Sequence, residues 1–270
     1  MKVAAIQMVS TPDVVRNLDA ARRLIARAAA EGAQLVALPE YFCLLGRSEL
    51  DKLAIAEQPG DGPVQQMLAG AAREHALWLV GGTLPMRIEG DADHVRNACC
   101  VYAPDGSMAA RYDKIHLFGF DNGRERHDES RTLAAGSDAV ALDLAPAGLR
   151  LGLSICYDLR FPELYRKLGA TAPCDLFAVP SAFTHTTGQA HWELLLRARA
   201  VENQAYVIAP AQGGLHENGR RTWGHSMIVD PWGEVLACLP AGEGVVTADV
   251  ESSRIAEVRR QLPALAHRRF

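Results

Sequence analysis

Hydrophobic positions follow two periods along the chain, one typical of strands and one typical of helices. Short apolar runs bounded by polar or turn residues predict buried strands, and apolar residues spaced three or four apart predict helices. In the first third of the chain, the strand pattern occurs at residues 2–9, 34–38 and 77–80, and the helical pattern at residues 12–30 and 63–75. The chain therefore begins as an alternation of strands and helices.

Two similar turn sequences separate pairs of strand-like segments. They are APDG at residues 103–106 and DPWG at residues 230–233, with Pro and Gly where turns favour them. Both predict hairpins, and their similarity is a weak sign of an internal duplication. The other predicted strands are residues 140–144, 149–155, 175–179, 206–210 and 244–250, and the other predicted helices follow Arg160 or cover residues 189–201 and 252–261.

The connections between these elements favour one domain over two. No low-complexity linker divides the chain, so we expect a single domain over residues 1–270. Residues 114–132 are polar and contain two glycines, which predicts a long loop of the kind that is usually functional. Hairpins among strand–helix units predict mixed sheets packed face to face with helices outside.

Composition and charge restrict the classes of function. The chain is 49% hydrophobic and 22% charged, which is typical of a globular protein, and its net charge of −4 gives no general attraction for nucleic acid. No apolar run reaches the ~18 residues of a membrane-spanning helix. We expect a cytoplasmic protein, since no basic-then-apolar leader follows Met1. The six cysteines lack CxxC spacing, so we expect neither a metal nor a cofactor.

One cysteine stands where a predicted strand gives way to a helix. The alternating run from Leu149 to Ile155 stops at Cys156, and Pro162 favours a helix start shortly afterwards. A thiol there lies among free backbone N–H groups and near the positive end of a helix. We expect this environment to favour the thiolate and to hold a developing oxyanion.

A nucleophilic thiol needs a group that takes its proton. Four of the nine histidines are candidates by position, namely His116, His185, His191 and His225. Glu40 follows the apolar segment LVALP, and Lys114 follows the hairpin strand RYD. A carboxylate, an ammonium and a thiol at three strand ends predict an acyl-transfer site, with Glu40 as base, Lys114 stabilising the oxyanion and Cys156 carrying the acyl group.

Three segments resemble the signatures of the nitrilase superfamily of carbon–nitrogen hydrolases. They are LPE ending at Glu40, RYDKIHLF around Lys114 and GLSICYDLRFPELYR around Cys156. The resemblance continues through AVPSAFT, the segment 187–212 and GHSMIVDPWGEVL. It implies an α-β-β-α sandwich, a homodimer or higher homo-oligomer, and a Glu40–Lys114–Cys156 triad. It also implies a second glutamate, Glu129, that positions Lys114, although Asp121, Glu125 and Asp128 lie in the same polar stretch.

Within that superfamily, RYDKIHLFGF and CYDLRFPE resemble the Nit-type amidases, which hydrolyse an amide next to an α-keto acid end. The resemblance implies a small amide substrate and release of carboxylate and ammonia. The segment GLHENGRRTWGHSMIVDPWG and the tail RRQLPALAHRR are closer to amidases of deaminated glutathione than to ω-amidases. Nitrilase, N-carbamoyl hydrolase and ω-amidase activities remain open. So do a dimeric scaffold without activity and a redox sensor at Cys156.

Three residues that follow the cysteine are candidates for substrate binding. Arg160 is expected either to bind a substrate carboxylate in a bidentate manner or to pair with Glu163 on the helix. Tyr157 and Phe161 are expected either to form pocket walls or to belong to the core. The backbone N–H of Tyr157 is also the expected second donor to the oxyanion.

Overall fold

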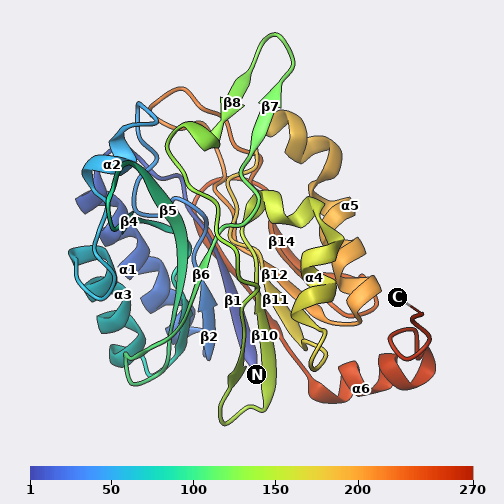
Figure 1. Ribbon diagram of the computed structural model, residues 1–270. Coiled ribbons are helices and arrows are strands. Elements are labelled where there is room, and N and C mark those ends of the chain that lie inside the picture. Colours follow the sequence, from blue (N-terminus) through green and yellow to red (C-terminus); the bar gives the residue numbers. More distant parts are fainter. Residues whose placement is uncertain (270) are drawn as a thin grey trace.

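Two mixed β-sheets form the centre of the molecule (Figure 1). The computed structural model describes residues 1–269. The strands of the first sheet are β1 (Lys2–Gln7), β2 (Leu35–Ala37), β3 (Trp78–Val80), β4 (Leu84–Ile88), β5 (Asp91–Tyr102), β6 (Met108–Asp113) and β15 (Gly244–Asp249). Their order is β15-β1-β2-β3-β5-β4, and β6 also pairs with β5, along residues 98–102.

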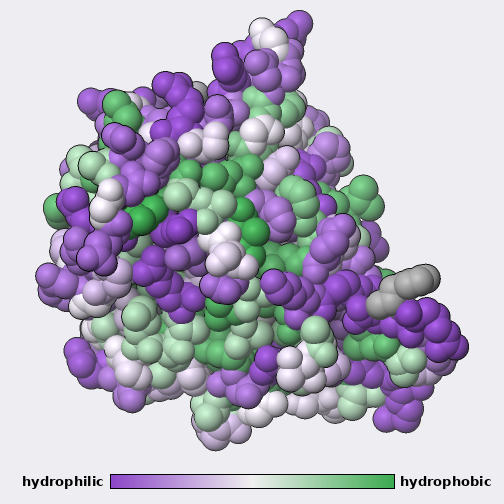
Figure 2. Space-filling model, viewed as in Figure 1, coloured by the Kyte–Doolittle hydropathy of each residue, from purple (hydrophilic) through white to green (hydrophobic). Residues whose placement is uncertain are grey.

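The second sheet comes from the second half of the chain. Its strands are β9 (Ala141–Leu144), β10 (Leu149–Leu153), β11 (Leu176–Ala178), β12 (Tyr206–Ala209), β13 (Ser226–Val229) and β14 (Val235–Leu239), in the order β14-β13-β12-β11-β10-β9. A separate hairpin of β7 (Gly119–Asp121) and β8 (Arg126–Asp128) projects from the body, and its tip is largely hydrophilic (Figures 1 and 2).

Helices cover the outer faces of both sheets. They are α1 (Val14–Ala30), α2 (Asp51–Ala54), α3 (Pro63–Glu74), α4 (Pro162–Leu168), α5 (His185–Asn203) and α6 (Ser252–Gln261), with short 3-10 turns η1 (Glu129–Arg131) and η2 (Cys156–Arg160). Figure 1 shows α1 and α3 on the outside of the first sheet, and α4 and α5 on the outside of the second. None of the helices within residues 1–269 is long and apolar enough to cross a bilayer.

The alternation of side chains along β1 explains these layers. Val3 and Ala5 belong to a buried cluster that includes Leu151 of the second sheet. Ala4 and Ile6 point the other way and belong to a cluster with α1 and α3. Since successive strand residues face opposite sides of a sheet, one face of β1 packs against the other sheet and one against helices. The expected α-β-β-α sandwich is therefore confirmed.

Each sheet has three parallel strands at its centre. In the first they are β1, β2 and β3, connected through α1 and α3, and in the second β10, β11 and β12, connected through α4 and α5. A hairpin through the predicted turn 103–106 or 230–233 follows each set. In such sheets ligands bind at the carboxyl ends of the parallel strands.

Several expected boundaries differ from the structure. Helix α5 begins at His185 rather than at residue 189, because Thr184 caps it by accepting a hydrogen bond from Thr187 N–H at 3.3 Å. Position 188 lies inside this helix and requires a glycine, because a Cβ there would lie 2.2 Å from the Cβ of Trp223. The expected loop 114–132 contains the β7–β8 hairpin and η1, and β4 was not predicted.

Candidate active site

The thiol of Cys156 lies at the turn between β10 and α4, as expected. Cys156 has φ of +49°, an uncommon conformation for a residue with a side chain, and its N–H donates to Pro180 O at 3.0 Å. The N–H of Ile155 donates to the buried Asp158 carboxylate at 2.8 Å. These bonds fix a sharp turn that directs Cys156, only 8% exposed, away from the strand.

Three charged side chains form a buried cluster beside this turn. The Lys114 ammonium donates to Glu40 Oε1 at 2.8 Å and to both carboxylate oxygens of Glu129, at 2.8 and 3.0 Å. The side chains of Lys114 and Glu40 are 0% and 1% exposed. A buried charge is stable only when it is paired and hydrogen-bonded. Lys114 must therefore stay protonated to hold the two glutamates together.

Both sheets hold the Glu40 carboxylate in place. The side-chain amide of Asn97, on β5, donates to Oε1 at 2.9 Å. The backbone N–H of Ala182, which follows β11 of the second sheet, donates to Oε2 at 3.0 Å. With Lys114, these donors leave Glu40 little freedom to rotate. A carboxylate fixed in this way is a precisely placed base.

The pKa values of the three charged groups shift in different directions. Burial raises the pKa of Glu40 above its ordinary value, against the opposing effect of the Lys114 ammonium. Burial also disfavours the charged form of Lys114, but the carboxylates of Glu129 and Glu40 outweigh it and raise the pKa of Lys114 well above its ordinary value. For Glu129, the ammonium and several hydrogen-bond donors outweigh burial and lower the pKa. Glu40 is thus the carboxylate that accepts a proton more readily.

The expected thiolate at Cys156 is wrong for the resting enzyme. Burial, and next the charge of Glu40, raise the pKa of Cys156 well above that of an ordinary thiol, although Lys114 opposes them. Helix α4 starts at Pro162, only after the 3-10 turn, so the positive helix end assumed from the sequence does not begin at the thiol. The raised pKa favours the protonated thiol, and Glu40, a hydrogen-bond partner of Cys156, is positioned to receive the proton.

A second buried carboxylate connects the lysine loop to the cysteine turn. Asp158 accepts from Tyr112 O–H at 2.7 Å and from the N–H of His116 at 3.0 Å, and it contacts His116 Nδ1 at 2.7 Å. Because Asp158 also holds the N–H of Ile155, it fixes Lys114's loop relative to Cys156. His116, one of the histidines considered as the base, is engaged here instead.

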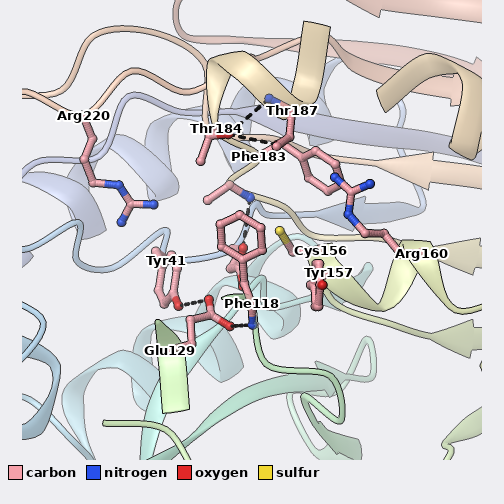
Figure 3. A pocket seen from close by; sticks show the side chains of 12 residues that line it. Tyr41, Phe118, Glu129, Cys156, Tyr157, Arg160, Phe183, Thr184, Thr187 and Arg220 are labelled. Carbon is pink, nitrogen blue, oxygen red and sulfur yellow. Dashed lines mark hydrogen bonds between the residues drawn. The ribbon is translucent and has the colours of Figure 1, made fainter. Parts of the chain in front are cut away.

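A small pocket leads to the thiol (Figure 3). Its volume of about 20 Å³ is enough for roughly one water molecule. No second cysteine and no histidine lines it within the described residues, so neither a histidine base nor a resolving cysteine is in place. The lining residues are Glu40, Tyr41, Phe118, Glu129, Cys156, Tyr157, Arg160, Ala182, Phe183, Thr184, Thr187 and Arg220.

The three expected substrate-binding residues differ in position. Tyr157 and Arg160 line the pocket, and the Arg160 guanidinium lies over the Tyr157 ring, 5.7 Å from its centre. Arg160 contacts His191 Nδ1 at 3.2 Å and forms no pair with Glu163. Phe161 does not line the pocket, because its ring stacks on His116 at 3.7 Å. It supports Tyr157 from behind, at a ring distance of 5.3 Å.

Comparisons with known proteins agree with this geometry. The model of the carbon-nitrogen hydrolase family matches residues 2–260. The chain belongs to the carbon-nitrogen hydrolase family. The expected superfamily and the expected enzyme class, a hydrolase of carbon–nitrogen bonds, are therefore confirmed.

Individual relatives of this carbon-nitrogen hydrolase match along nearly their whole length. It is 42% identical to the deaminated glutathione amidase of Synechocystis sp. over 268 residues, which cover 99% of this chain and 97% of the relative. It is 39% identical to omega-amidase NIT2 of Homo sapiens over 269 residues, covering 99% and 95%. The crystal structure of Nit3 of Saccharomyces cerevisiae, a member of branch 10 of the nitrilase superfamily, has a TM-score of 0.89 at 32% identity, covering 100% and 97%.

Sequence reasoning missed several residues of the hydrolase pocket. Tyr41 donates its hydroxyl to Glu129 Oε1 at 2.8 Å, and the N–H of Phe118 donates to Oε2 at 2.7 Å (Figure 3). Asn97, which holds Glu40 without lining the pocket, had one detectable signal, since it is a polar residue directly before the apolar run ACCVY. Arg220 lies in a segment quoted for its resemblance, but nothing in the sequence singled it out, because only the fold brings its loop to the pocket at Cys156.

Proposed function

We propose that this hydrolase is a thiol-dependent amidase that cleaves deaminated glutathione through a thioester on Cys156. The observation that carries the proposal is the fixed Glu40–Lys114–Glu129 cluster beside a buried but pocket-facing thiol. A nucleophile, a base and an orienting group within reach of one another are the signature of covalent acyl transfer. The substrate is favoured by the deaminated glutathione amidases among the relatives.

In the first half-reaction the sulfur of Cys156 attacks the amide carbonyl while its proton passes to Glu40. The Lys114 charge and the N–H of Tyr157 stabilise the oxyanion, since that N–H donates to no protein acceptor within residues 1–269. The carbon–nitrogen bond then breaks. The leaving nitrogen takes the proton from Glu40, and the acyl group stays on Cys156 as a thioester.

In the second half-reaction water attacks the thioester and gives its proton to Glu40. The carbon–sulfur bond breaks, the acid leaves, and the proton returns from Glu40 to the sulfur of Cys156. One base thus serves twice, which suits a carboxylate whose pKa burial has raised. Glu129 does not exchange protons in this scheme, because Lys114, Tyr41 and the N–H of Phe118 hold it ionised.

The leaving group distinguishes the two leading substrates. Deaminated glutathione carries cysteinylglycine on its amide nitrogen, so its cleavage releases a peptide amine rather than the ammonia expected above. An ω-amidase acting on α-ketoglutaramate releases ammonia. Both reactions form 2-oxoglutarate, whose carboxylate next to the keto group is a partner for the Arg160 guanidinium.

Release of 2-oxoglutarate from the two substrates under identical conditions tests the proposal. We expect a higher kcat/KM for deaminated glutathione, and an acyl adduct in the intact-protein mass after a short substrate pulse. Preference for α-ketoglutaramate would assign ω-amidase activity instead. Turnover of neither, with ammonia released from a nitrile or an N-carbamoyl amino acid, would move the chain to another activity of the superfamily. A chain inactive on all four would match the scaffold alternative.

We also propose that two copies of the chain associate through α5 and the neighbouring turn. The solvent-exposed apolar residues there are Leu194 and Val201 on the helix, Trp232 in the turn and Leu236 on the following strand β14. The turn lies against the helix, since Arg197 Nε donates to Gly233 O at 2.8 Å. An apolar surface of this kind favours an interface between copies. Sedimentation of Leu194→Asp should show a monomer where the parent chain is a dimer.

Two broader expectations remain part of the proposal. A single catalytic domain is supported by the buried cluster that joins residues of both sheets. A cytoplasmic location is consistent with free cysteines throughout residues 1–269. Thiol titration of the chain purified without reductant tests the second point, since disulfides would contradict it.

A further inference from the structure

A second, wider cavity adjoins the pocket that leads to Cys156. Its volume is about 540 Å³, against about 20 Å³ for the pocket at the thiol. The two share Thr184 and Arg220 as lining residues, so the cavity is an extension of the same site. A group too large for the narrow pocket can lie in this cavity while its reacting carbonyl remains at Cys156.

The wall of this cavity is mainly basic. Its charged and titratable lining residues are Glu125, Arg126, His127, His185, Arg220 and Arg221. Arg126 lies within 3.9 Å of Asp121 and is mostly exposed. Arg220 is half-buried, and its guanidinium has no hydrogen-bond or ion-pair partner within residues 1–269. An unpaired, partly buried guanidinium is suited to an anionic ligand.

The geometry also shows which end of a substrate reaches Arg220. In Figure 3, Tyr41 and Arg220 lie on one side of Cys156, and Tyr157 and Arg160 lie on the other. The Glu40 carboxylate lies on the Tyr41 side, since Lys114 links it to Glu129, which accepts from the Tyr41 hydroxyl. In the proposed mechanism Glu40 protonates the leaving nitrogen. The acyl part therefore lies toward Arg160, and the leaving group lies toward Arg220.

We propose that Arg220 binds the terminal carboxylate of a peptide leaving group, within the cavity that it shares with Thr184 and Arg221. The inference rests on the proposed amidase activity and adds a specificity-determining residue to it. A substrate with a carboxylate at each end would then be held by two guanidinium groups, with its amide between them at Cys156. Cysteinylglycine supplies such a carboxylate, whereas the ammonia leaving group of α-ketoglutaramate does not.

The experiment compares deaminated glutathione with its C-terminal amide, which has the same scissile bond and lacks only the distal carboxylate. The parent chain should have a kcat/KM roughly 10- to 100-fold higher for the acid, as expected for a hydrogen bond to a charged group. In Arg220→Gln this preference should shrink to less than about threefold. Arg220→Lys, which keeps the charge without the fork, should retain an intermediate preference.

Arg124→Gln is the matched control, since Arg124 is an exposed arginine of the neighbouring hairpin outside the cavity wall. This variant should keep the full preference for the acid over the amide. If Arg124→Gln lost as much of that preference as Arg220→Gln, the preference would come from the general positive charge of the surface and not from a site at Arg220. Equal rates for acid and amide in the parent chain would overturn the carboxylate site while leaving the amidase activity intact. A parent chain that cleaves neither compound would overturn both proposals. The parent comparison stands even if Arg220→Gln fails to fold.

Discussion

The two sheets contribute differently to the site, although their parallel strands end at the same edge. The first sheet supplies buried charge, with Glu40 after β2 and Lys114 after β6. The second supplies the neutral thiol of Cys156 after β10 and the N–H of Ala182 after β11. Charges in a core must be paired with opposite charge, whereas a neutral thiol needs no partner and a backbone N–H needs only a hydrogen-bond acceptor, here Glu40. The first sheet therefore holds the catalytic groups whose burial costs the most stability.

The largest expected effect is a loss of activity without a loss of stability. Cys156→Ala removes the nucleophile, and we expect 2-oxoglutarate release to fall by about 10⁴-fold or more. The urea midpoint should change little, because a neutral side chain at the pocket edge is removed. Turnover close to that of the parent chain would rule out the thioester.

The corresponding change on the first sheet should affect both properties. Lys114→Met leaves Glu40 and Glu129 buried without their cation, so we expect a loss of roughly 3–5 kcal/mol in the free energy of unfolding. Loss of the oxyanion partner should lower kcat by ~10²–10³-fold. Urea unfolding measures the first and steady-state kinetics the second. If Lys114→Met left the free energy of unfolding unchanged, the proposed difference in stability cost between the two sheets would be wrong.

A matched double variant tests the cause of this instability. Adding Glu129→Gln to Lys114→Met removes one of the two unpaired carboxylates. Part of the lost free energy of unfolding should return, while activity stays low. A further decrease in stability would show that Glu129 contributes through its packing rather than its charge.

The pH dependence of activity should report the carboxylate of the first sheet. Burial raises the pKa of Glu40 above its ordinary value of 4.5, and the reaction needs Glu40 ionised. The midpoint of the acid limb of kcat/KM should therefore lie above pH 4.5. Below that midpoint, kcat/KM should fall tenfold per pH unit. Circular dichroism over the same range separates this limb from unfolding. A limb at or below pH 4.5 would contradict the assignment.

The smallest effect is expected at the periphery of the charged cluster. Tyr41→Phe removes the hydroxyl that donates to Glu129 at 2.8 Å. We expect a loss of about 1.5 kcal/mol in the free energy of unfolding and a several-fold lower kcat, since Glu129 then holds Lys114 less firmly. A change equal to that of Lys114→Met would show that Tyr41 takes part in the chemistry itself.

The sequence predicted most of the fold because its signals are local. The turns at 103–106 and 230–233 and the last helix occur where the pattern placed them. The start of α5 was missed because the residues before Gln189, HTTG, carry no apolar period, whereas the Thr184 cap starts the helix at His185. The hairpin β7–β8 was missed because its residues are mostly polar and none is buried, so no apolar period indicates it.

The sequence predicted which residues form the site better than it predicted their ionisation states. Glu40, Lys114 and Glu129 do meet, as the resemblance implied. The ionisation state of Cys156 was wrong, because it depends on burial and on a carboxylate 116 positions away in the sequence. The contacts of Asn97 and Arg220 likewise depend on distant segments, which periodicity does not reveal.

Because its reacting groups come from two separately hydrogen-bonded sheets, the enzyme is assembled only when the sheets dock. A nascent or partly unfolded molecule has a sulfhydryl without its proton acceptor, and therefore has no means of hydrolysing other amides in the cell. Recovery of turnover during refolding would accordingly report the completed assembly of both sheets.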